Sequence, residues 1–95
     1  MEKYITYNHN NFDNIGLELY KFSITLSIAI NTNKTLVLFN NEYMSIIDTF
    51  IKYKYKSINI KEFNELNFKY ISYKDIIDDN NIYITYKDKD ELKLE

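Results

Sequence analysis

The chain has no cysteine, arginine, proline or tryptophan, and only one glycine, one alanine and one histidine in 95 residues. The absence of cysteine excludes disulfides, thiolate chemistry and cysteine-ligated metal sites. No apolar run is long enough to cross a bilayer, and the first residues lack the basic and apolar regions of a secretory signal. We therefore expect a cytoplasmic protein without a membrane span.

Lysine supplies all the positive charge of the side chains, apart from the single histidine, and the formal net charge is −2. A chain with this balance has no overall basic field that would draw it to nucleic acid, so we expect no nucleic-acid partner. Isoleucine, asparagine, lysine and tyrosine dominate the composition. Their codons are rich in A and T, and those of arginine and proline are mostly rich in G and C. Nucleotide bias in the source genome therefore explains this composition without any function.

The length of 95 residues is enough for one domain with an adequate core. Runs of β-branched, aromatic and aliphatic residues predict strands over 3–7, 35–39, 68–73 and 82–86. Apolar spacing followed by lysines predicts a helix over 44–56, and shorter helices are predicted over 61–66 and 74–79. The charged residues 88–95 have little to bury and are predicted to fray.

The segment 22–30 supports two interpretations. Its apolar residues alternate with Ser, Thr and Ala, which is the pattern of a half-buried strand. A strand over 17–31 would be about 50 Å long at ~3.3 Å per residue, far beyond the usual length. A helix over the same residues would be about 22 Å long and would match a neighbouring strand of five or six residues. The alternation favours the strand, and the length favours the helix.

A helix over 17–31 would carry two apolar faces and would have to be covered on both sides. One face consists of Leu17, Tyr20, Ile24 and Ile28, and the other of Leu19, Phe22, Leu26 and Ile30. Asp13 and Asn14 lie just upstream and offer side-chain oxygens for an N-cap.

Residues 13–38, DNIGLELYKFSITLSIAINTNKTLVL, resemble without a gap the amino-terminal segment of the α-1,2-fucosyltransferases, glycosyltransferase family 11. Ile15 and Gly16 fall on the Leu-Gly of that segment, and residues 19–22 fall on its Leu-Phe-Gln-Tyr. Further along, residues 42–51 resemble the stretch with a WDTF sequence in some members, and residues 68–76 resemble the FHYxEI strand that follows it. Together these segments cover most of the chain.

The resemblance implies a helix over 17–31, with Ser23, Thr25, Ser27 and Ala29 where the family has small residues that let helix and sheet approach closely. It also implies an α/β fold, a Rossmann-like parallel sheet of about four strands with flanking helices, equivalent to part of one lobe of a two-lobed GT-B transferase. The family transfers fucose from GDP-fucose to a sugar hydroxyl. Its glycine-rich first loop lines the cleft between the lobes, where backbone N–H groups approach the ligand.

The sequence departs from the family where the chemistry occurs. The family's paired glycines fall on Asp13 and Asn14, and its Asn-Gln falls on Leu17 and Glu18. Because there is no arginine, the His-x-Arg-x-Gly-Asp motif that neutralises the diphosphate is absent, and lysine lacks the planar fork of arginine. We therefore expect no catalytic residue, no metal site and no cofactor in this chain; GDP-fucose would be the donor substrate of a complete enzyme.

We expect residues 1–95 to form a single domain that is the acceptor-side lobe, or a fragment of it, of a fucosyltransferase-like protein that is inactive alone. The predicted substrate-binding residues are Asn10, Asn11, Asn14 and Gly16, which would face a carbohydrate acceptor. A second lobe, or self-association, would cover an apolar face that is otherwise exposed. The alternative is a small non-catalytic α/β interaction protein from an AT-rich genome.

Three other features have simpler explanations than function. His9 is the single histidine and has no evident ligand or carboxylate partner, so we interpret it as a solvated loop residue. Residues 52–56 alternate lysine with tyrosine and could stack on bases, but an acidic chain favours a helix end. The aspartates at 75, 78, 79, 88 and 90 lack the spacing and turn glycine of a calcium loop and predict a solvated surface.

Overall fold

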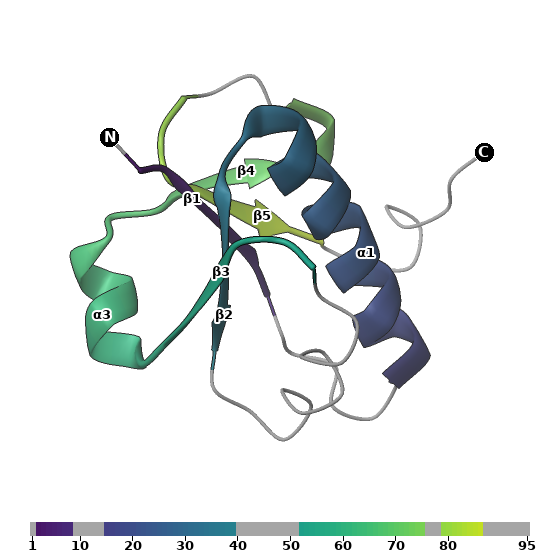
Figure 1. Cartoon of the computed structure of the whole chain (residues 1–95), viewed down its shortest axis with the longest axis horizontal. Coiled ribbons are helices and arrows are strands. Elements are labelled where there is room, and N and C mark those ends of the chain that lie inside the picture. Colours follow the sequence, from purple (N-terminus) through teal and green to yellow (C-terminus); the bar gives the residue numbers. More distant parts are fainter. Residues whose placement is uncertain (1, 9–14, 40–51, 76–78, 87–95) are drawn as a thin grey trace.

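The computed structural model describes residues 2–8, 15–39, 52–75 and 79–86 (Figure 1). Its centre is a sheet of five parallel strands in the order β3-β2-β1-β5-β4. The strands are β1 (Tyr4–Tyr7), β2 (Thr35–Phe39), β3 (Tyr55–Ile58), β4 (Lys69–Ser72) and β5 (Ile82–Thr85). The helices within these ranges are α1 (Ile15–Thr32) and α3 (Ile60–Glu65), and Tyr73–Asp75 form the 3-10 turn η1. The expected Rossmann-like α/β class is confirmed, with five strands instead of about four.

The segment with two interpretations is helical, because α1 spans Ile15–Thr32. Its hydroxyl residues hydrogen-bond to the carbonyl four residues earlier: Ser23 Oγ donates to Leu19 O at 2.9 Å, and Thr25 Oγ1 donates to Lys21 O at 2.8 Å. Thr32 Oγ1 makes the same kind of bond to Ile28 O at 2.7 Å. These local bonds satisfy the hydroxyl groups inside a helix. The alternation that resembles a strand is therefore compatible with the helical backbone.

The helix ends in a Schellman motif at Asn33, which adopts a left-handed conformation with φ 56°. Lys34 N donates to Ala29 O at 3.0 Å, and Asn33 N donates to Ile30 O at 3.4 Å. Asparagine is among the few residues other than glycine that tolerate this backbone region. The chain thereby reverses direction and enters β2 two residues later.

The expectation that both apolar faces of this helix are sheltered is wrong. The buried stripe consists of Lys21, Phe22, Thr25 and Ala29. Leu19, Tyr20 and Ile30 are 39%, 37% and 54% exposed. Of the four small residues, Thr25 and Ala29 face the core, while Ser23 and Ser27 are exposed. No helix within the described ranges is both long and apolar enough to cross a membrane.

The predicted helix over 44–56 is wrong at its carboxyl end, where Tyr55–Ile58 form β3. Residues 44–51 lie outside the described residues, and 52–54 are not helical. β3 pairs only with β2 and forms one edge of the sheet. An edge strand tolerates exposed lysine and tyrosine, and only Ile58 of this strand is buried. The lysines that suggested a helix end therefore belong to a strand and its approach.

Three strand regions carry nearly the same pentapeptide, KYITY at 3–7, KYISY at 69–73 and IYITY at 82–86. In β4 and β5 the copies pair without an offset, so Tyr70 lies beside Tyr83 and Ile71 beside Ile84. β1 is shifted by two residues against β5, so that Ile5 lies beside Ile82. An even shift keeps each side chain on the same face of the sheet. The aliphatic residues therefore gather beneath α1 in the core, with Ile5, Leu36, Leu38, Ile82 and Ile84 all fully buried.

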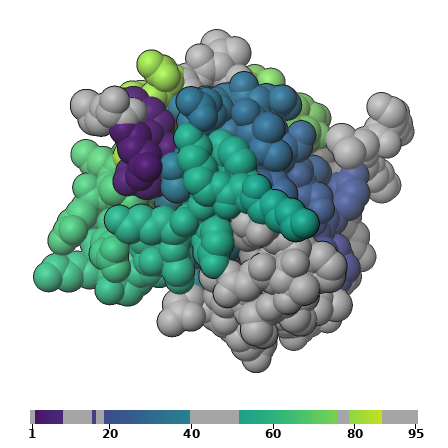
Figure 2. Space-filling model, viewed as in Figure 1, coloured from purple at the N-terminus to yellow at the C-terminus, as the bar shows by residue number. Residues whose placement is uncertain are grey.

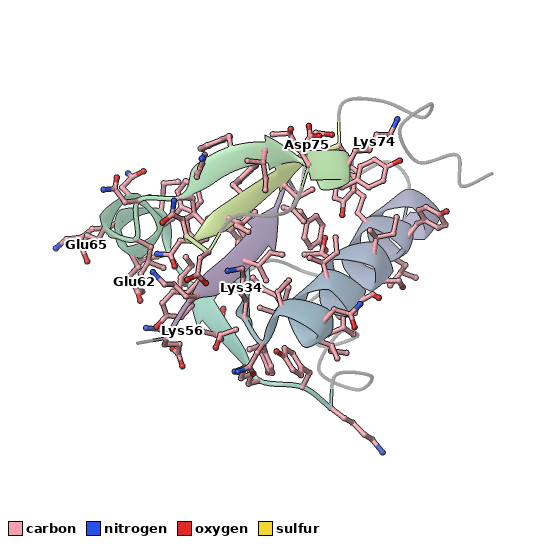
Figure 3. All side chains as sticks on the ribbon, turned by 90° about the horizontal axis from the view of Figure 1, so that it is seen from above. Lys34, Lys56, Glu62, Glu65, Lys74 and Asp75 are labelled. Atoms are coloured by element: carbon pink, nitrogen blue, oxygen red, sulfur yellow. The ribbon has the colours of Figure 1, made fainter. Side chains whose placement is uncertain are left out.

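The other face of the sheet carries α3 and a row of aromatic rings, so that the sheet lies between α1 and α3 (Figure 3). Phe63 of α3 packs with Phe39 at 5.1 Å between centroids, with Phe68 at 5.0 Å and with Tyr83 at 5.7 Å. The helix α3 lies within one residue of the predicted 61–66, and Asn59 caps it through a bond from Glu62 N to Asn59 Oδ1 at 2.9 Å. The predicted helix over 74–79 corresponds to η1 at Tyr73–Asp75; residues 76–78 are not described.

Candidate functional site

The direction of the chain across the sheet changes at the carboxyl ends of β1 and β5. From β1 the chain continues to β2 and β3 on one side of the sheet, whereas β5 and β4 occupy the other side. In open parallel sheets ligands bind outside the carboxyl ends of the strands, where such a change of direction occurs. The described residues that follow these two strands are Asn8 and Tyr86.

Asn8 joins the two strands at this edge through its side-chain amide. Its Nδ2 donates to Tyr86 O at 3.5 Å, and its Oδ1 accepts from Tyr86 N at 3.4 Å. Both distances are at the long end of the range for hydrogen bonds. The amide therefore continues the β1–β5 pairing by one residue through weak hydrogen bonds. Its donor and acceptor lie at the edge where a ligand hydroxyl would approach.

Tyr86 connects this edge to α1. Its hydroxyl lies 3.0 Å from Thr25 Oγ1, and the Thr25 proton is donated to Lys21 O at 2.8 Å. A threonine hydroxyl has one proton, so Tyr86 is the donor in its contact with Thr25. Burial raises the pKa of Tyr86 to about 12. Tyr86 is therefore a neutral hydrogen-bond donor near pH 7 and not a general base.

Two further tyrosines complete what we call the carboxyl-edge cluster, which consists of Tyr7, Asn8, Thr25, Tyr73 and Tyr86. The rings of Tyr7 and Tyr86 are 6.3 Å apart at an interplanar angle of 72°, and those of Tyr73 and Tyr86 are 5.8 Å apart at 30°. Tyr7 and Tyr86 are buried, and Tyr73 is partly exposed. The Lys74 ammonium lies 5.8 Å from the centroid of the Tyr73 ring.

The sequence contains a pattern that points to this cluster, but the predicted substrate-binding residues do not include it. Each of the three similar pentapeptides ends in tyrosine, at Tyr7, Tyr73 and Tyr86. Because all the strands are parallel, the last residues of these pentapeptides lie at the same edge of the sheet. The repeated final tyrosine could therefore have identified the edge where aromatic side chains gather.

Of the predicted substrate-binding residues, the structure describes only Gly16. It is the second residue of α1 and is exposed. Asn10, Asn11 and Asn14 lie outside the described residues, as does His9. That the four residues together bind a substrate therefore stays a prediction.

The chemistry that the cluster offers is hydrogen bonding and ring contact. It combines a carboxamide, a threonine hydroxyl and phenol groups, without a carboxylate among its members. Across the ranges that the structure describes, no three His, Cys, Asp or Glu side chains are placed to hold a metal ion. Lys74 and Asp75 are exposed beside the cluster, toward the end of α1 opposite to Lys34 (Figure 3). The arrangement suits recognition of a neutral polar ligand.

Comparisons of the chain with protein-family models, with curated proteins and with solved structures found no match.

Proposed function

We propose that this chain is the acceptor-side lobe of a fucosyltransferase-like glycosyltransferase and that it binds a carbohydrate at the carboxyl edge of its sheet. The observation that carries the proposal is the order strand, Gly16 junction, long helix and adjacent parallel strand over residues 4–39. That order is the one that the resemblance of residues 13–38 to the fucosyltransferases implies. A separate lobe would supply the donor, GDP-fucose.

The neutral character of the carboxyl-edge cluster supports an acceptor sugar over a nucleotide diphosphate. A sugar presents hydroxyl groups that both donate and accept, and the Asn8 amide, whose two bonds to Tyr86 are long, could exchange them for bonds to a sugar. A partly exposed ring such as Tyr73 provides a flat apolar surface beside them. A diphosphate needs fixed positive charge, and the chain has no arginine to provide a bidentate contact.

Two features limit what the lobe does alone. The chain has no His-x-Arg-x-Gly-Asp motif for the donor. Tyr86, whose pKa is raised to about 12, is a poor base near pH 7. We therefore propose binding without transfer for the isolated chain.

Calorimetric titration tests this function. The chain is titrated with a β-galactoside and separately with GDP-fucose. We expect saturable binding of the galactoside at the carboxyl edge and no binding of GDP-fucose at that edge, because only the acceptor side is present. Absence of heat for both ligands, confirmed by unchanged amide NMR spectra, would refute the proposal.

The site is then located by substitution at Gly16, which is exposed at the start of α1. Gly16→Gln places a long side chain at the junction without breaking a helix, so we expect at least a tenfold loss of galactoside affinity. Leu19→Gln is the matched control, because Leu19 lies one turn further along α1 and is also exposed. Equal effects of both substitutions would place the ligand elsewhere.

A second candidate function is a non-catalytic interaction module, and the aromatic face of the sheet favours it. Tyr70 stacks on Tyr83 with centroids 4.3 Å apart but is itself 59% exposed, and Ile60 of α3 is 66% exposed. Exposed rings on a sheet face are typical of protein contact surfaces. Silence toward both sugar ligands, together with concentration-dependent sedimentation that Tyr70→Ser abolishes, would support this candidate instead.

A further inference from the structure

A pocket of about 310 Å³ lies at the amino edge of the sheet, opposite to the carboxyl-edge cluster. Its lining includes three lysines, Lys3, Lys34 and Lys54, and two carboxylates, Glu2 and Asp79. The remaining lining comes from the last turn of α1 and the residue that follows it. We name this hollow the lysine pocket.

The lysines meet because each immediately precedes a strand. Lys3 precedes β1, Lys34 precedes β2 and Lys54 precedes β3, and these three strands are neighbours. Backbone bonds fix their spacing, with Thr35 N donating to Lys3 O at 2.8 Å and Leu36 N donating to Lys54 O at 3.2 Å. Neighbouring strands lie about 4.8 Å apart. In Figure 2 the purple start of β1 lies close to the teal segment that leads into β3.

Lys34 is the least exposed of the three, with only 2% of its surface accessible. Its Nζ donates to Asn80 O at 3.1 Å. An ammonium has three N–H groups, so this bond leaves donors for another acceptor. A buried cation is costly without further partners. The side chain therefore brings a partly satisfied positive charge to the wall of the pocket.

The other lysines differ in their bonding. Lys54 Nζ donates to Asn33 Oδ1 at 2.9 Å and to Asn33 O at 3.3 Å. Lys3 is partly exposed and belongs to the lining of the pocket. Lys54 is thus positioned by the end of α1, and Lys3 contributes to the lining from the residue before β1.

The negative groups do not cancel this charge. Three lysines and two acidic residues belong to the lining, which leaves it one net positive charge. The hydrogen bond to the Glu2 carboxylate raises the pKa of Tyr4, so Glu2 already engages that phenol. The carbonyl end of α1 adds partial negative charge, but Lys54 binds the carbonyl oxygen of Asn33 there. The site is therefore moderately cationic.

We propose that the lysine pocket binds a phosphate group, either free or on a small molecule. A dianionic oxyanion would accept hydrogen bonds from two or three ammonium groups at once, and charge-assisted bonds of this kind are the strong ones. The volume accommodates a small phosphorylated compound, and the mixed lining offers partners for its hydroxyl groups. The proposal does not depend on the proposed function, because the pocket lies at the other edge of the sheet.

The test is a titration of the full chain with inorganic phosphate, pyrophosphate and glucose 6-phosphate at low ionic strength, followed by calorimetry. We expect saturable binding with one site per chain, above the response to chloride at equal ionic strength. Tighter binding of glucose 6-phosphate would indicate a phosphorylated metabolite, and equal or tighter binding of phosphate or pyrophosphate would indicate the free anion. Absence of saturable binding for all three would overturn the proposal.

Charge-removing variants identify the site. Lys3→Gln and Lys54→Gln remove the ammonium groups of a partly exposed and an exposed residue, and should each weaken phosphate binding about tenfold, the loss of one charge-assisted bond. Lys34→Gln should weaken it at least as much, and the other two variants, at less buried positions, keep the test valid if this buried substitution disturbs folding. Lys61→Gln, on α3 and outside the pocket lining, is the matched control and should bind as the parent does.

Variants of the carboxylates should have the opposite effect. Glu2→Gln and Asp79→Asn remove negative charge from the lining and should tighten phosphate binding about threefold, the size expected of an exposed charge pair. Weakening by either variant, or equal affinity in Lys3→Gln, Lys54→Gln and Lys61→Gln, would contradict the proposed site.

Discussion

Two asparagines fasten the strand region at opposite edges of the sheet, and their bonds differ. At the amino edge, Asn81 Oδ1 accepts from Tyr4 N at 3.0 Å and Asn81 Nδ2 donates to Leu66 O at 2.6 Å. At the carboxyl edge, both bonds between Asn8 and Tyr86 are 3.4 Å or longer. An asparagine side chain therefore connects the strands strongly at the amino edge, through Asn81, and weakly at the carboxyl edge, through Asn8.

The difference extends to the neighbouring groups. The amino edge combines these short bonds with three lysines and two carboxylates, whereas the carboxyl-edge cluster is composed of neutral hydroxyl, amide and phenol groups. A tightly bonded, charged edge can hold a small anion without rearranging. A loosely bonded neutral edge can exchange its amide contacts for those of a sugar. The two edges are thus suited to different ligands.

The largest expected effect is that of Asn81→Ala. The substitution leaves Tyr4 N and Leu66 O without their partners in a partly buried place, and we expect a loss of about 2 kcal/mol in the free energy of unfolding. Denaturant unfolding measures it. Asn64→Ala on the exposed side of α3 is the control and should change stability by less than about 0.5 kcal/mol. A loss no greater than that of the control would remove the contrast between the edges.

Tyr53→Phe is the next most severe change. The Tyr53 hydroxyl lies 2.7 Å from Lys34 O and 3.0 Å from Ala29 O. Its one proton is therefore shared between the residue before β2 and a residue near the end of α1. We expect its removal to cost about 1.5 kcal/mol, again by denaturant unfolding. Tyr20→Phe, with its ring at 37% exposure, is the matched control and should be nearly neutral. Indistinguishable midpoints for the two variants would show that the hydroxyl does not stabilise this edge.

At alkaline pH, titration of Tyr86 at the carboxyl edge should lower the stability of the protein. The pKa of Tyr86 is raised from 10.0 to about 12 by folding, so its contribution to stability is complete below pH 10 and is lost as the pH rises through about 12. We expect a loss of about 1 kcal/mol by pH 11 from this residue. The free energy of unfolding, measured from pH 8 to 11, should fall less steeply with pH in Tyr86→Phe than in the parent. An unchanged slope would mean that Tyr86 titrates at its ordinary pKa.

The smallest effect is expected from Asn8→Ala. Its two long bonds predict a loss of only about 0.5 kcal/mol, measured beside Asn81→Ala in the same denaturant series. The variant should nevertheless weaken galactoside binding, because the proposed contact is with the amide. A loss of stability that matches Asn81→Ala would show that both edges are held equally.

The sequence was sufficient for the elements whose pattern is local. The apolar run TLVLF predicted β2 to the residue, and the similar runs near both ends predicted β1 and β5. β3 was missed because an edge strand buries only Ile58, and its lysines resemble a helix end. The prediction that both apolar faces of α1 are covered was wrong, because hydropathy alone does not distinguish a buried leucine from Leu19, which is 39% exposed.

The sites depend on contacts that sequence spacing does not contain. Thr25 and Tyr86 are 61 positions apart, and only the sheet order brings them together. The lysine pocket arises because three consecutive strands in the sheet begin after a lysine, a coincidence that becomes a site only when the strands are known to be parallel neighbours. The positions of Lys3 and Lys34 at the start of two predicted strands were visible. That of Lys54 was not, because β3 was missed, and neither was the proximity of the three lysines.

The most direct measurement is a pair of amide NMR titrations on the same isotopically labelled chain, one with a β-galactoside and one with inorganic phosphate. If the two edges are separate ligand surfaces, the sugar will shift amides around Asn8 and Gly16, and phosphate will shift those of Lys3, Lys34 and Lys54. Shifts by both ligands at one common set of residues, or by neither ligand at any, would contradict this assignment.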